Sequence, residues 1–279
     1  MVLIIRMLKK LRLLGLVNLT FSHKINNKVF KLPLNRKIGY DLFFEKEPWM
    51  VNVLKNLLTL SPQKAFIDVG VNVGQTLLIA KSIKPDLVYY GFEPNPICVS
   101  YLHQLIKINA LTQVSVFPVA LGDQEGLGTL YLDALKPDDG NGSLVEGFRD
   151  TKGKVGELVQ VWSEKNIGML RQVESGIIKI DVEGGELEVV KCLANIIQHQ
   201  RPILICEILP VYTLGNTFRI KRQEQLLKHI QEVDYVFYRI KQDGRLTSLK
   251  EIEVHGNVED SNYLFVPAHL SSQVEALFP

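Results

Sequence analysis

The amino-acid sequence predicts an α/β fold with a mostly parallel seven-stranded sheet, an antiparallel edge strand and helices on both faces. One observation is residues 66–76, FIDVGVNVGQT, which form a short apolar strand, a glycine-marked turn and the start of a helix. A second is the alternation of short strands and helical segments after residue 61. A third is that the strands are apolar throughout, which is typical of parallel sheets covered on both faces.

The first sixteen residues predict a helix with two different faces. The apolar face holds Leu3, Ile4, Met7, Leu8, Leu11 and Leu14, and the other face holds Arg6, Lys9, Lys10 and Arg12. The segment is too short and too charged to span a membrane, and its charges lie in the wrong place for a secretory signal. Two interpretations stay open: a weak contact with a membrane surface, or packing against the protein itself or a partner chain.

Residues 25–45 contain turn-forming residues and predict a small β-hairpin. A helix follows from Pro48 to Leu60, because proline is favoured in the first turn of a helix. We therefore expect an N-terminal extension over residues 1–60 and the main domain over residues 61–279.

The main domain alternates strands and helices. Strands are predicted at 65–69, 87–92, 114–119, 176–181, 202–207, 235–240 and 262–266, with helices at about 74–84, 97–109, 185–199 and 220–232. Residues 241–260 read as a polar connection, so the last two strands are expected to pair antiparallel at one edge. The alternation pauses over residues 124–172, where glycines are frequent and short strands are predicted at 128–132 and 157–162. We expect this insertion to form a wall or lid beside the site.

Composition excludes several classes of function. The chain has 279 residues and a formal net charge of only +2, which gives no indication of a nucleic-acid partner. Its three cysteines are far apart and its six histidines are scattered, so neither a disulfide framework nor a zinc site is expected. A reducing, cytoplasmic location fits this cysteine usage. The alternative location is peripheral, at the inner face of a membrane.

The glycine-marked turn predicts a cofactor site. Gly70 and Gly74 allow a sharp turn and a close approach of the backbone to a ligand. The Asp-x-Gly-x-Asn-x-Gly spacing lacks the third glycine of a dinucleotide motif. Glu93 follows Gly70 by 23 residues, at the end of the next strand, where an acid can accept from ribose hydroxyls. The predicted cofactor-binding residues are Asp68, Gly70, Asn72, Gly74, Glu93, Asn95, Ala120 and Leu121.

Three carboxylates are expected to converge beside this turn. Asp181 and Glu183 end one strand and Glu207 ends the next, and ligands bind at the carboxyl ends of such strands. Lys179 lies within the buried strand, so we expect it to pair with Asp181 or Glu207. These groups could serve as a general base, bind substrate hydroxyls or hold a divalent cation, and the cation is the less favoured of these. Asn141 and Ser143 in the insertion are candidate substrate contacts, although a plain turn would explain them equally well.

Five segments together resemble the FkbM family of S-adenosylmethionine-dependent methyltransferases. They are FIDVGVNVG (66–74), FEPNP (92–96), ALGD (120–123), IKIDVEGGE (178–186) and PILICE (202–207). The resemblance implies a Rossmann-like fold, S-adenosylmethionine as the methyl donor, and methylation of a hydroxyl on a sugar, glycan or secondary metabolite. It also implies that Asp68, Gly70 and Gly74 hold the methionine moiety, that Glu93 holds the ribose, and that the carboxylates line the acceptor side.

Two departures from the family pattern concern the acceptor pocket and the turn. Family members usually carry a Thr-Leu-Asp-like segment where this chain has Val161-Trp162-Ser163-Glu164, and alanine is common where Val71 stands. For catalysis we expect Asp181 to accept the hydroxyl proton, with Glu183 as the second candidate and Lys179 holding the pair. The alternatives are an NAD-type oxidoreductase and a non-catalytic module that keeps the fold.

Overall fold

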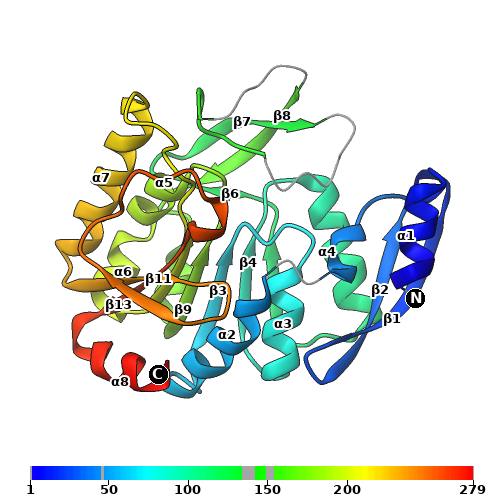
Figure 1. Ribbon diagram of the computed structural model, residues 1–279, viewed down its shortest axis with the longest axis horizontal. Coiled ribbons are helices and arrows are strands. Elements are labelled where there is room, and N and C mark those ends of the chain that lie inside the picture. The colour runs from blue at the N-terminus through cyan, green and yellow to red at the C-terminus, as the bar shows by residue number, and fades with distance from the viewer. Residues whose placement is uncertain (1, 45–46, 134–141, 149–153, 279) are drawn as a thin grey trace.

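The computed structural model describes residues 2–44, 47–133, 142–148 and 154–278. Its centre is an eight-stranded sheet in the order β12-β11-β13-β10-β9-β3-β4-β5 (Figure 1). The strands from β10 to β5 are parallel, and β13 runs antiparallel between β10 and β11. Their bounds are β3 (Ala65–Val69), β4 (Tyr89–Phe92), β5 (Val114–Phe117), β9 (Ser175–Ile180), β10 (Ile203–Glu207), β11 (Tyr235–Ile240), β12 (Leu246–Leu249) and β13 (Asn262–Pro267). The predicted α/β class is thus confirmed.

The prediction of seven strands with one antiparallel edge strand needs two corrections. First, β12 lies within the segment expected to be a polar connection, because a turn at Gly244 (φ 82°) returns the chain alongside β11. Second, the edge of the sheet is β12, whereas β13 lies inside the sheet with partners on both sides. The half-buried Leu246 and Leu249 give β12 its apolar contacts.

Helices cover both faces of the sheet (Figure 1). One face carries α2 (Pro48–Leu60), α3 (Gln75–Ile83), α4 (Pro96–Ile108) and α8 (Ser271–Leu277), and the other carries α5 (Glu186–Cys192), α6 (Ala194–Gln200) and α7 (Thr217–Gln231). The predicted bounds of α2 are confirmed. The helix expected over 185–199 is instead two helices, because Leu193 has a ψ of 4°, which interrupts the helical pattern at that residue.

The N-terminal elements pack beside α3 and α4. They are α1 (Val2–Lys10), a 3-10 turn at Leu14–Leu16, the hairpin of β1 (Asn18–Ile25) and β2 (Lys28–Asn35), and a 3-10 turn at Tyr40–Phe43. The hairpin spans residues 18–35 and turns at residues 26–27, so it begins and ends earlier in the chain than the predicted range of 25–45. Ile5 of α1 lies outside the predicted apolar face, yet its side chain is fully buried. It packs into the core that the hairpin shares with Leu78 and Leu105. The division of the chain at residue 60 stays a prediction.

The insertion folds onto a second, small sheet in the order β6-β8-β7. Its strands are β6 (Ala120–Leu121), β7 (Gly126–Asp133) and β8 (Lys154–Trp162), so both short strands predicted in the insertion are confirmed. No helix in the described part of the chain is long and apolar enough to cross a membrane.

A buried lysine provides a test of this fold. Lys81 is fully buried, and its Nζ donates to the backbone carbonyls of Pro85, Leu87 and Thr112 at 3.2, 2.5 and 2.6 Å. We expect Lys81→Met to lower the free energy of unfolding by about 3 kcal/mol, because these acceptors lose their donor. Lys84→Met, which removes an exposed pair with Asp86, is the matched control and should cost less than about 1 kcal/mol. Urea denaturation measures both changes, and equal losses would contradict the role given to Lys81.

Candidate active site

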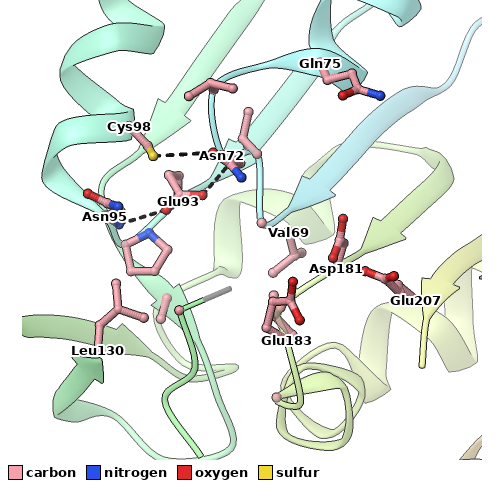
Figure 2. Close-up of a pocket in the computed structure, with 18 of the residues that line it drawn as sticks. Val69, Asn72, Gln75, Glu93, Asn95, Cys98, Leu130, Asp181, Glu183 and Glu207 are labelled. Carbon is pink, nitrogen blue, oxygen red and sulfur yellow. Dashed lines mark hydrogen bonds between the residues drawn. The ribbon is translucent and has the colours of Figure 1, made fainter. Parts of the chain in front are cut away.

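A cavity of about 1520 Å³ opens at the carboxyl ends of the parallel strands. Its walls come from the turn after β3, the ends of β4, β9 and β10, the small β6-β8-β7 sheet and the N-terminal elements. Figure 2 shows Asp181, Glu183 and Glu207 on one side of this space and Glu93 with Asn95 on another. The sheet therefore brings together groups that are more than 100 residues apart in the chain.

The glycine-marked turn forms one wall of the cavity. Gly70 has a φ of 91°, and a Cβ atom built on it would lie 1.8 Å from the carbonyl oxygen of Asp181, so only glycine fits. Asn72 (φ 51°) and Gln75 also line the cavity. Gly74 does not line it: this residue (φ 91°) starts α3 and packs against α4.

Glu93 is fixed by the backbone around it. One carboxylate oxygen accepts from the N–H of Asn72 at 2.7 Å and the other from the N–H of Asn95 at 2.8 Å (Figure 2). Asn95 in turn caps α4 by accepting from the N–H of Ile97 at 3.0 Å. Burial raises the pKa of Glu93 to about 7, against the two N–H bonds, which lower it. This carboxyl group therefore changes charge near neutral pH.

Asp68 lies behind the cavity wall rather than on it. Its side chain is fully buried, it accepts from the Tyr89 hydroxyl, and its Oδ1 has no hydrogen-bond partner in the described structure. Burial raises its pKa to about 6, against the charge of Lys179, which lowers it. Lys179 pairs in register with Asp68 across β9 and β3. The structure thus places Asp68 next to the buried lysine, and a direct contact with a cofactor stays a prediction.

Lys179 and Asp181 form the expected ion pair. The Lys179 Nζ lies 2.8 Å from Asp181 Oδ2, and the lysine side chain is only 6% exposed against 28% for the aspartate. Burial would lower the pKa of Lys179, but the charges of Asp181, Asp68 and Glu47 outweigh it and raise the pKa. Lys179 is therefore a cation at neutral pH, and it belongs to the lining of the cavity.

Glu207 and Glu183 complete the acidic side. Oxygen atoms of Asp181, Glu183 and Glu207 all lie within 4.8 Å of one another. Burial and the nearby charge of Asp181 raise the pKa of Glu207 well above the usual glutamate value, which favours its protonated form. It also accepts from the Ser261 hydroxyl at 3.0 Å. Glu183 has the left-handed φ of 57°, a strained conformation of the kind found at functional sites. A divalent cation at these oxygens stays a less favoured prediction.

The insertion supplies an apolar wall. Ala120 and Leu121 line the cavity as predicted, together with Leu130, Leu144 and Val161. Ser143 does not line it: its Oγ accepts from the N–H of Val145 at 3.2 Å, as in a plain turn. Asn141 lies outside the described residues.

Several cavity residues were not predicted from the sequence. Gln75 directly follows the glycine turn, and its amide donates to Glu47 at 3.3 Å. Glu188, also on the cavity wall, forms an ion pair with Arg222. The position of Gln75 next to Gly74 could have predicted that it lines the cavity. Glu47, by contrast, precedes α2 and reaches the site only through the tertiary fold.

Two adjacent glycines after Glu183 offer a matched test of the loop. A Cβ on Gly184 (φ 108°) would lie 2.2 Å from the Phe148 ring, whereas the nearest atom to a Cβ on Gly185 would be 3.4 Å away. We expect Gly184→Ala to lower the free energy of unfolding by about 2–4 kcal/mol through strain and overpacking. Gly185→Ala should stay within about 1 kcal/mol. Thermal or urea unfolding of both variants checks this, and equal effects would show that the loop is not held against Phe148.

Comparisons with known proteins identify the family of this chain. A family model described as the methyltransferase FkbM domain matches residues 68–237, more than half of the chain. No curated protein sequence matches the chain.

Solved structures with a similar chain course include a methyltransferase FkbM from Methylobacillus flagellatus KT, at 16% identity over 83% of this chain and 51% of that chain, with a TM-score of 0.47. This chain thus spans about half the length of that protein. An Agrobacterium tumefaciens SAM-dependent methyltransferase matches at 9% identity over 89% of this chain and 70% of its own, with a TM-score of 0.45. An SAH-bound methyltransferase from Podospora anserina matches at 10% identity over 78% of this chain and 75% of its own, with a TM-score of 0.40. On the strength of the family model, the chain belongs to the FkbM family of S-adenosylmethionine-dependent methyltransferases.

Proposed function

We propose that this protein transfers a methyl group from S-adenosylmethionine to a hydroxyl oxygen of a sugar, glycan or other small-molecule acceptor. The observation that supports this most is the set of carboxyl groups Asp181, Glu183 and Glu207 beside the glycine turn, with Lys179 beneath them. A hydroxyl acceptor needs a group that takes its proton as the new bond forms, and a carboxylate can do so.

The residues present fit S-adenosylmethionine. The start of α3, where Gln75 and Thr76 line the cavity, suits the methionine carboxylate, since helix N-termini attract anions. Glu93 suits the ribose hydroxyls, and Ala120 with Leu121 offers an apolar surface for the adenine. When bound, this cofactor supplies a methyl group already activated on its sulfonium. The protein must then mainly align the acceptor oxygen and exclude water.

The acidic residues have different proposed roles in the methyl transfer because their protonation states differ. Asp181 pairs with Lys179 through Oδ2, and its carboxylate is the proposed acceptor of the hydroxyl proton. Glu207 carries its own proton and can donate a hydrogen bond to the acceptor or to Asp181. Glu183 is the second candidate for the base. The acceptor oxygen thus gains the methyl group and loses its proton to a carboxylate.

Thermal shift separates this proposal from the two alternatives, because a ligand that binds the native state raises its melting temperature. We expect S-adenosylmethionine and its demethylated product to stabilise the protein, and NAD to have no effect. Stabilisation by NAD alone would favour an oxidoreductase, and a response to neither ligand would favour a non-catalytic module.

Asp181→Asn tests the proton acceptor. We expect methyl transfer to slow by about 100- to 10,000-fold with cofactor affinity nearly unchanged, because the amide cannot take a proton. Turnover and calorimetry measure the two quantities separately. Asp86→Asn, at an exposed aspartate outside the cavity, is the control and should keep full activity. Unchanged turnover in Asp181→Asn would remove Asp181 from the chemistry.

Cofactor affinity should depend on pH through Glu93. Its pKa of about 7 means that the carboxylate forms as the pH rises through neutrality, and the ionised form accepts more strongly from ribose hydroxyls. We expect cofactor affinity to rise by up to about tenfold from pH 6 to pH 8, since the ionised fraction of Glu93 grows by that factor. Glu93→Gln should bind more weakly and show no such rise.

Glu186→Gln is the matched control for this titration. Glu186 is also buried, has a pKa raised to about 7 by burial, and does not line the cavity. It should therefore keep the pH dependence of the wild-type protein. A pH profile that disappears in Glu186→Gln but persists in Glu93→Gln would overturn the assignment.

A further inference from the structure

The basic charge of this protein is concentrated at its N-terminus. The first 40 residues contain nine Lys or Arg residues and no Asp or Glu, whereas residues 41–279 carry 23 basic and 30 acidic residues. The chain as a whole is nearly neutral at +2, so this asymmetry is hidden in the total. The N-terminal elements therefore form a cationic region on a protein that is otherwise net acidic, and a cationic region attracts an anionic surface.

The same region exposes large apolar side chains. Ile5 and Leu14 point inward, which leaves Leu3 and Leu16 each 80% exposed, with Met7 and Leu11 more than half exposed. Helix α1 lies at the opposite edge of the molecule from α7 (Figure 1). Exposed apolar side chains among Lys and Arg are the pattern of a short helix that lies in the headgroup region of an anionic bilayer.

The cavity reaches this region. Lys9, Arg12, Leu16 and Lys37 belong to its lining, together with the glycine turn and the carboxylates. Lys9 also lies over the Tyr40 ring at 4.4 Å, so α1 is held beside the chain that leads to α2. The rim of the cavity and the exposed face of α1 are thus parts of one surface.

We propose that residues 2–19 dock the protein on an anionic lipid bilayer and that the acceptor is a hydroxyl-bearing molecule drawn from that membrane. The docking is inferred from the charge and exposure of these residues alone. The membrane-borne acceptor rests in addition on the proposed methyl transfer. Basic side chains at the rim would attract the phosphate of a lipid headgroup or lipid-linked sugar, while the carboxylates receive its hydroxyl.

Vesicle binding of the full chain tests the docking. We expect flotation with vesicles of phosphatidylcholine plus phosphatidylglycerol, little with phosphatidylcholine alone, and a loss of binding as salt is raised. The double variant Leu3→Glu/Met7→Glu changes two exposed residues outside the cavity, and its partition coefficient should fall by about tenfold or more. Leu214→Glu, which is 77% exposed just before α7, is the matched control and should bind like the wild-type protein.

Calorimetry with S-adenosylmethionine shows whether each variant is folded. We expect the same cofactor affinity in the wild-type protein, the double variant and Leu214→Glu. Equal binding to both kinds of vesicle, no binding, or an unchanged double variant would each overturn the docking. If α1 instead contacts a protein or a second copy of the chain, no lipid dependence will be seen.

Transfer of labelled methyl into a membrane extract tests the acceptor. We expect the label in the organic-solvent phase, and label confined to the aqueous phase would overturn a membrane-borne acceptor. Absence of any transfer would count against the proposed function, while the vesicle result would still decide the docking. The two failures are therefore distinguishable.

Discussion

The structure of this site depends on one buried cation. Lys179 is held in the middle of the sheet, with Asp68 beside it on β3 and Asp181 just after the end of β9. Burying a charge costs several kcal/mol unless it is paired, so the lysine and its acids are stable only as a group. The pairing fixes Asp181 at the cavity. It also explains why Glu207, next to an existing negative charge and largely buried, retains its proton.

Much of this arrangement follows from sequence pattern. Residues two apart on a strand share a face, which predicted the Lys179–Asp181 pair, and the carboxyl ends of parallel strands meet, which predicted that Glu207 would join Asp181 and Glu183. The glycine turn and Glu93 were likewise expected near one another, and the N–H of Asn72 bonds directly to Glu93. Local periodicity and strand order determine these features.

Other features depend on tertiary packing and were not predictable in this way. Asp68 has the sequence position of a cofactor residue, yet the register between β3 and β9 turns it toward the buried lysine. The helical wheel of α1 could not show that Ile5 would be the side chain to pack inward, since that choice is made by the hairpin and α4. Strand β12 forms from a polar segment because β11 offers it a free edge. Gln75 and Glu47 meet only because α2 and α3 lie together.

The division of protons between Asp181 and Glu207 is the central claim, because it determines which group can take the proton of a hydroxyl. Carbon-13 NMR of the glutamate carboxyl groups measures it most directly, with Glu207→Gln identifying the signal. The account predicts that the Glu207 carboxyl stays protonated through neutral pH and titrates well above the ordinary glutamate range. Titration of this signal in the ordinary glutamate range, near pH 4, would contradict it.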